Sequence, residues 1–211
     1  SIKTEKVYVL YNGVDRKIKK FPKKKKEILF VGRLVSEKGA DLYVQTLRSI
    51  ASTFPDWKFG LIGSFRLGEH KNTNSYAQRV IKIFNEIGSQ ALFYGFKNHE
   101  FVEEKMKTAS IIVIPSIWEE PFGLVAAEAM SNGISIIASK VGGMPEIIGD
   151  NGVLIENINY KNLKKNLIEL LKNNSLRESY QKKAWKNFKL SSALSSKKLD
   201  DYRRIIFQNY Y

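Results

Sequence analysis

Short apolar runs alternate along the chain with longer segments in which apolar residues recur at the helical period. The apolar runs predict strands near residues 7–11, 28–31, 58–62, 91–94, 111–114 and 134–138. Between them, Val80, Ile83 and Ile87 follow helix spacing, and Asn98 can cap a helix that runs to Lys107. This alternation predicts an α/β fold with a doubly wound parallel sheet of about six strands and helices on both faces.

Beyond residue 155 the pattern becomes purely helical. Leu163, Leu167 and Leu171 form an apolar stripe, and the rest of this segment is rich in Lys and Asn. We therefore expect a single domain, with an α/β core in residues 1–158 and a helical tail in residues 159–211.

The composition of the 211 residues is that of a globular protein. Hydrophobic residues make up 43% of the chain, there is no cysteine, and no apolar run reaches the length of about 18 residues that spans a bilayer. These features exclude a disordered chain, a disulfide framework and a thiolate metal site. We expect a soluble, cytoplasmic protein.

The formal net charge of +14 is concentrated in a lysine-rich run between Lys17 and Lys26. The run can be a solvated surface loop, or it can contact anionic lipid headgroups or an anionic lipid-linked acceptor, which would place the protein at the inner face of a membrane. Only Phe21 is available to stack on bases, so we expect no nucleic-acid partner.

The most informative segment covers residues 111–128, I-I-V-I-P-S-I-W-E-E-P-F-G-L-V-A-A-E. An apolar strand leads into a turn containing two prolines and then into a helix that carries Glu128. The first backbone N–H groups of that helix, near Phe122, Gly123 and Leu124, have no intrahelical partner and attract an anion such as a phosphate.

A second anion-binding element precedes it at residues 32–39, G-R-L-V-S-E-K-G. Arg33 and Lys38 lie in the loop between a strand and a helix. Because the loops that follow parallel strands open at the same edge of the sheet, these cations and the Phe122 helix start are expected to converge on one crevice.

These segments resemble the retaining nucleotide-sugar glycosyltransferases of family 4, which have the two-domain GT-B fold. The resemblance covers about residues 7–155 and rests on four ordered motifs: N-G-V-D at residues 12–15, G-R-L-V-S-E-K-G at 32–39, the pair Glu120 and Glu128 around P-F-G-L, and G-G-M-P-E at 142–146. It implies a Rossmann-like donor-binding domain that forms one half of a GT-B fold.

The resemblance implies a role for each matching position. Arg33 and Lys38 would neutralise the diphosphate of the donor, and Glu120 would accept hydrogen bonds from the transferred sugar; these three are the implied catalytic residues. Glu128 would accept from the ribose hydroxyls, and the base would rest near residues 94–97. The other implied donor-binding residues are Gly32, Phe96, Phe122, Gly123 and Leu124. The implied donor is a UDP-sugar, with a GDP-sugar as the alternative, and no cofactor is expected.

The chain departs from the family pattern in the loop after residue 62. It reads G-S-F-R-L-G-E-H, so no donor contact is assigned to residues 63–70. There is no D-x-D pattern, and we expect Arg33, Lys38 and helix N–H groups to replace a divalent metal. No general base is identifiable; the resemblance implies that the leaving phosphate takes the acceptor proton.

The resemblance further implies that the chain is the C-terminal half of a longer enzyme. The absent N-terminal domain would bind a glycan or lipid-linked acceptor, and this half alone would be inactive. The last helix, near residues 195–207, would pack on that domain and would otherwise expose Tyr202, Ile206, Phe207, Tyr210 and Tyr211.

The expected function is transfer of a hexose-type sugar to an acceptor hydroxyl with retention, in glycan, lipopolysaccharide or capsule synthesis. Two alternatives remain: a nucleotide- or phosphate-binding regulatory module, and a sugar-nucleotide isomerase with a related two-domain fold.

Five further residues keep alternative interpretations or receive no role. Trp118 is either a core ring or a platform for the sugar, and Gly142 and Gly143 form either an ordinary turn or a backbone contact near the sugar. His70 and His99 lack metal-ligand spacing and are assigned no role.

Overall fold

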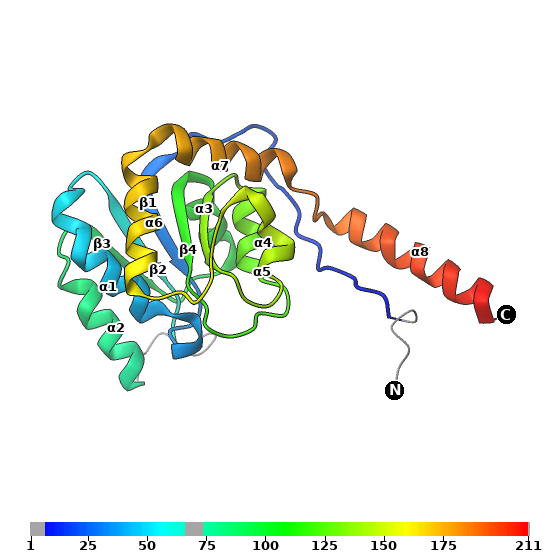
Figure 1. Ribbon diagram of the computed structural model, residues 1–211, viewed down its shortest axis with the longest axis horizontal. Coiled ribbons are helices and arrows are strands. Elements are labelled where there is room, and N and C mark those ends of the chain that lie inside the picture. The colour runs from blue at the N-terminus through cyan, green and yellow to red at the C-terminus, as the bar shows by residue number, and fades with distance from the viewer. Residues whose placement is uncertain (1–6, 66–73, 211) are drawn as a thin grey trace.

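The computed structural model describes residues 7–65 and 74–210 and has a parallel β-sheet at its centre (Figure 1). The sheet has six strands in the order β3-β2-β1-β4-β5-β6. Their bounds are β1 Lys25–Val31, β2 Lys58–Ile62, β3 Ala91–Gly95, β4 Ala109–Ile114, β5 Ser135–Ser139 and β6 Val153–Ile155. The predicted doubly wound parallel sheet is confirmed.

Helices cover both faces of the sheet. The helices are α1 Ala40–Ile50, α2 Ser75–Asn85, α3 His99–Thr108, α4 Leu124–Ser131, α5 Met144–Ile148, α6 Tyr160–Lys172, α7 Asn174–Asn187 and α8 Ser192–Tyr210. Side chains alternate along each strand, so Ile28 packs with α1, α2 and α6, whereas Leu29 faces the core formed with α3, α4 and α5. Asn98 caps α3 as predicted, accepting a hydrogen bond from the backbone N–H of Phe101.

One predicted strand is wrong. Residues 7–11 do not join the sheet, and the sixth strand is β6, which pairs with β5 at the edge. The apolar residues at 7–11 lie beside α8 instead: the Tyr8 and Tyr202 rings are 4.6 Å apart, and the Tyr202 hydroxyl donates to the Val9 carbonyl at 3.2 Å. Strand β6 is too short for its periodicity to have been visible in the sequence.

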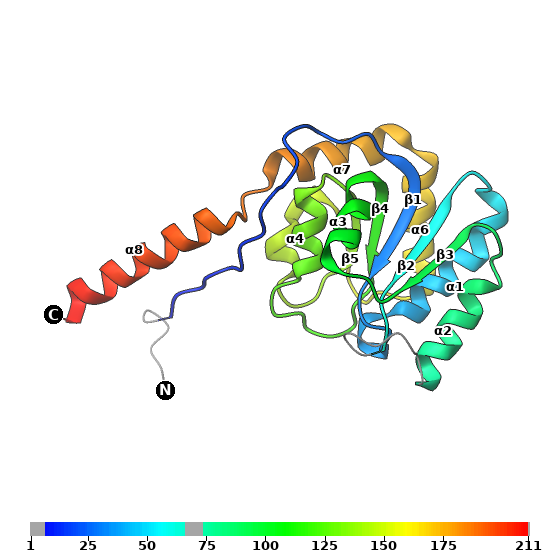
Figure 2. The ribbon, with the colours of Figure 1, turned by 180° about the vertical axis from the view of Figure 1, so that it is seen from behind.

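Helix α8 and the N-terminal segment extend together away from the sheet (Figures 1 and 2). Ile206 and Phe207 are exposed as expected, but Tyr202 is half-buried by its contact with Tyr8. The Tyr210 side chain and Tyr211 lie outside what the structure describes. None of the described helices is long and apolar enough to cross a bilayer.

The chain order reverses between the central strands β1 and β4. Successive units β1–β2–β3 spread to one side of β1, and β4–β5–β6 spread to the other. At such a switch point the loops after the two central strands diverge and leave a crevice outside the carboxyl edge of the sheet. Lys38, which follows β1, and Glu120, which follows β4, flank this crevice.

Candidate active site

The loops that follow β1 and β4 are in direct contact at the carboxyl edge of the sheet. The backbone N–H of Ile117 donates to the Glu37 carbonyl at 2.9 Å. Gly39 has a φ of 66°, and a Cβ atom there would lie 2.1 Å from the Pro115 carbonyl oxygen. Only glycine allows the two loops to approach this closely.

Contact between these loops places Lys38 against Glu120, although 82 positions separate them. The Lys38 ammonium forms an ion pair with Oε1 of Glu120, and the Ser116 hydroxyl donates to the same oxygen at 2.8 Å. The side chains are 25% and 14% exposed, respectively. A carboxylate oxygen is therefore fixed between an ammonium group and a hydroxyl group at the mouth of the crevice.

A cavity of about 330 Å³ lies beside this ion pair. It is lined by the ends of β1 and β4 with the loops after them, by the start of α4, and by one residue each from the N-terminal segment and α5: Asn12, Val31, Gly32, Lys38, Ile114, Ser116, Glu120, Pro121, Phe122, Gly123, Leu124, Val125 and Met144. Gly123 precedes α4 with a φ of 91°, and no side chain caps this helix start. The first N–H groups of α4 are thus available to an anion in the cavity.

The glycine pair after β5 packs on the backbone of the Glu120 turn. A Cβ atom on Gly142 would lie 2.2 Å from the Glu120 carbonyl oxygen, and the Gly143 N–H donates to that oxygen at 2.7 Å. The Gly142 N–H donates to the carboxylate of Glu119. Glu119, which has no predicted role, therefore holds the loop that carries Glu120 against the loop after β5.

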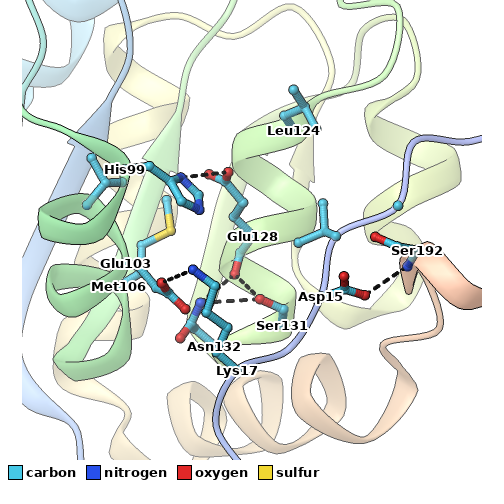
Figure 3. Close-up of a pocket in the computed structure, with 13 residues that line it drawn as sticks. Asp15, Lys17, His99, Glu103, Met106, Leu124, Glu128, Ser131, Asn132 and Ser192 are labelled. Atoms are coloured by element: carbon cyan, nitrogen blue, oxygen red, sulfur yellow. Dashed lines mark hydrogen bonds and ion pairs between the residues drawn. The ribbon is translucent and has the colours of Figure 1, made fainter.

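Glu128 lines a second cavity, of about 280 Å³, between α3, α4 and the N-terminal segment (Figure 3). The two cavities share Leu124. Burial raises the pKa of the Glu128 carboxyl, while His99 and Lys17 oppose the rise and Glu103 adds to it. The Nδ1 atom of His99 lies 3.7 Å from Oε1 of Glu128.

The sequence did not predict the contact of His99 with Glu128 or that of Ser116 with Glu120. His99 is the first residue of α3 and reaches toward α4, and Ser116 supports Glu120. The N-cap at Asn98 was the only signal for His99, because it places that residue at a helix start on the carboxyl edge of the sheet.

The residues described in the structure contain no group of three or more His, Cys, Asp or Glu side chains arranged to hold a metal ion.

Comparison with known proteins identifies the family. The family model for glycosyl transferases group 1 matches residues 13–187. This chain belongs to that family. A relative from Methanocaldococcus jannaschii, the uncharacterized glycosyltransferase MJ1178, is 35% identical over 173 residues, which are 81% of this chain and 45% of the relative.

Solved structures show the same fold. The glycosyltransferase domain superposes on Anabaena HepE in complex with UDP-glucose with a TM-score of 0.69 and 20% identity, over 84% of this chain and 48% of that one. It matches the C-terminal domain of a group 1 protein (LpcC) from Francisella tularensis with a TM-score of 0.65 and 26% identity, over 88% of this chain and 95% of that one. The fold is that of the C-terminal domain of a GT-B enzyme, and the chain spans about half the length of the curated relatives it matches.

The glycosyltransferase domain does not bring all predicted residues together. Lys38 and Glu120 are in contact, whereas Arg33 is exposed and has no hydrogen-bond or ion-pair partner among the described residues. Phe96 is half-buried after β3 and lines neither cavity. Trp118 is 60% exposed, so the interpretation of it as a core ring is wrong.

The loop after β2 is described only in part. Gly63 packs on the β1 loop, where a Cβ atom would lie 1.8 Å from the Gly32 carbonyl oxygen, and its N–H donates to the Gly95 carbonyl at 2.8 Å. Residues 66–70, including His70, lie outside the described residues.

Proposed function

We propose that this domain is the donor-binding half of a retaining glycosyltransferase that uses a UDP-sugar. One observation carries the proposal: the ion pair of Lys38 and Glu120 adjoins the uncapped start of α4 at the switch point of the sheet. Glu128 follows on the same helix and faces the adjoining cavity. HepE, a structural neighbour, was solved in complex with UDP-glucose, which favours UDP over GDP as the nucleotide of the donor.

The two cavities suggest how a donor would lie. The diphosphate would occupy the cavity beside Lys38, where the N–H groups at the start of α4 and the ammonium group neutralise it. The nucleoside would extend over Leu124 into the second cavity, where Glu128 accepts hydrogen bonds from the ribose hydroxyls. The sugar would point toward Glu120. Arg33 is exposed beside the same loop and would turn toward the phosphates once they bind.

During transfer, the bond between the anomeric carbon and the phosphate oxygen breaks, and a bond from the acceptor hydroxyl oxygen forms on the same face of the sugar. The acceptor proton passes to the departing phosphate oxygen. Negative charge grows on the diphosphate as its bond to carbon breaks, so Lys38 and the α4 N–H groups stabilise the transition state more than the bound donor. No metal ion or other cofactor takes part in this scheme.

The acceptor would be a glycan or a lipid-linked saccharide held by an N-terminal domain on the other side of the cleft. We place the reaction in glycan, lipopolysaccharide or capsule synthesis and expect the isolated domain to be inactive. Membership of the group 1 family favours sugar transfer over the isomerase alternative.

A thermal-shift screen tests the choice of donor. UDP, GDP, ADP and a panel of UDP- and GDP-sugars would be added to the chain, and we expect the largest rise in Tm with UDP compounds because a ligand that binds only the native state stabilises it. A larger shift with GDP compounds would overturn the choice of base. No shift with any nucleotide would overturn the proposed site.

A further inference from the structure

A strongly basic surface lies at the amino edge of the sheet, opposite the cavity beside Lys38. Residues 16–26, R-K-I-K-K-F-P-K-K-K-K, contain eight cations and no carboxylate. This segment runs beside α7 (Figure 2): the Phe21 and Trp185 rings meet edge-on at 5.7 Å, and Arg16 donates a hydrogen bond to the Trp185 carbonyl. Helix α7 and the residues after it add four more lysines, Lys182, Lys183, Lys186 and Lys189.

Some of these cations serve the fold. The Lys24 ammonium donates to the Asn132 carbonyl at 2.7 Å and to the Lys107 carbonyl at 3.0 Å, so it holds the carboxyl ends of α4 and α3 together. Burial lowers its pKa to about 7. Lys17 pairs with Glu103 at 2.7 Å, and both residues line the cavity that contains Glu128.

Other lysines have no such role. Lys19, Lys20 and Lys23 are exposed, and no described residue gives any of them a hydrogen-bond or ion-pair partner. The same holds for Lys186 and Lys189. We define these five residues, together with Lys25 and Lys183, as the basic face.

Within the described part of the chain, no carboxylate forms an ion pair with a lysine of the basic face. Glu178 is the acidic residue of α7, and it lies 3.8 Å from the ammonium group of Lys182. Lys182 does not belong to the basic face. A run of like charges that repel one another without compensating contacts favours an external anionic partner.

We propose that the basic face docks on a membrane surface rich in anionic lipid headgroups. Clusters of four to eight lysines attract such surfaces, and each lysine near the surface contributes separately, without a shaped pocket. Because the cavity beside Lys38 is lined by loops at the carboxyl edge, docking at the amino edge leaves it accessible.

The side chains favour lipid over nucleic acid. Sequence-tolerant binding of single strands needs aromatic rings free to stack on bases. On this face the Phe21 and Trp185 rings meet edge-on, and the Arg16 guanidinium lies over the Trp185 ring, 3.8 Å from its centroid. The remaining cations are lysines, which act as point charges and lack the planar fork that reads base edges.

Vesicle sedimentation tests the proposal with two triple variants that lose the same charge. One variant carries Lys19→Gln, Lys20→Gln and Lys23→Gln. The control carries Lys82→Gln, Lys161→Gln and Lys165→Gln, which are exposed on α2 and α6. Each chain would be mixed with vesicles of phosphatidylcholine alone or with added phosphatidylglycerol, and far-UV circular dichroism would confirm that both variants are folded.

We expect the unaltered chain to bind the anionic vesicles and not the neutral ones, with an affinity that falls as salt rises to about 0.15 M. Each lysine accounts for about a fivefold change, so the basic-face variant should bind about 100-fold more weakly. The control variant should bind less than about threefold more weakly.

Three results would overturn the proposal. The first is no binding to anionic vesicles at low salt. The second is an equal loss in both variants, which would show that net charge alone acts. The third is tighter binding to duplex DNA than to anionic vesicles, which would assign the face to nucleic acid.

Discussion

Replacing Glu128 with Gln separates recognition of the nucleoside from recognition of the diphosphate. Glu128 lines the second cavity and is not in contact with the cavity beside Lys38. The substitution keeps the size and shape of the side chain but removes its charge. The proposed arrangement therefore predicts weaker binding of UDP and unchanged binding of inorganic pyrophosphate.

The size of the effect follows from hydrogen-bond strength. Hydrogen bonds to a charged acceptor contribute about 1.5–3 kcal/mol, roughly twice those to a neutral one. An amide oxygen still accepts one hydroxyl, so the expected loss is about 1–2 kcal/mol, a rise of about 5- to 30-fold in the Kd for UDP.

Isothermal titration calorimetry with UDP and with pyrophosphate would measure both affinities. Glu103→Gln is the matched control, because Glu103 lines the same cavity but pairs with Lys17. We expect it to change the Kd for UDP by less than about twofold. The reasoning is refuted if Glu128→Gln weakens UDP and pyrophosphate equally, or if the control has the same effect as Glu128→Gln.

Further predictions concern Glu128, the Lys38–Glu120 ion pair and the close approach of the loops after β1 and β4. Burial raises the pKa of Glu128, and ribose requires its ionised form, so UDP affinity should rise as pH rises through that pKa. This pH dependence of UDP affinity should be absent in Glu128→Gln. If it persists in that variant, Glu128 is not the group that causes it. In the unliganded chain, the raised pKa means that the folded state holds the Glu128 proton more tightly than the unfolded state, so the chain loses stability as pH rises through that pKa. A glutamine does not titrate, so the Tm of Glu128→Gln should rise relative to that of the unaltered chain over the same pH range. Lys38→Met should lower the free energy of unfolding by about 1–3 kcal/mol, because it leaves a carboxylate that is 14% exposed without its cation. A double-mutant cycle with Glu120→Gln in urea should give a coupling of about 1–2 kcal/mol, and a coupling of zero would show that the pair contributes nothing to stability. Gly39→Ala should cost about 3 kcal/mol or more, whereas Gly88→Ala, also at positive φ but facing open space, should cost about 1 kcal/mol. Equal losses in urea unfolding would show that close approach of the loops is unimportant.

Much of the fold could be predicted because its central strands are buried on both faces. Strands such as β4, with six buried residues, read as continuous apolar runs between helical patterns. Residues 7–11 have the same appearance but lie beside α8 and leave Val7, Val9 and Leu10 exposed. Periodicity cannot distinguish this environment from that of a buried strand. Strand β6 was missed for a different reason. It has only three residues, too few to show a period, and it is recognised as a strand by its pairing with β5 at the sheet edge.

The site was predictable to the extent that topology determines it. The switch-point rule places the loops of Lys38 and Glu120 at one edge, and the structure shows them in contact. Contacts that depend on side-chain direction were not predictable. His99 reaches Glu128 through the tertiary arrangement of α3 and α4, which local sequence spacing does not encode. Ser116 and Glu120 are only four positions apart, but they lie in the irregular loop between β4 and α4, where no helix or strand period predicts which side chains meet.

Metal-free binding of a nucleoside diphosphate tests the central claim most directly. The chain would be titrated with UDP by calorimetry, with EDTA and with added Mg²⁺, beside the variant Lys38→Ala. The proposed site predicts binding in EDTA with little change on adding Mg²⁺, and a Kd at least about tenfold higher for Lys38→Ala, because a charge-assisted contact of about 1.5–3 kcal/mol is lost. Absence of UDP binding at millimolar concentration, or binding only with the divalent ion, would contradict the account.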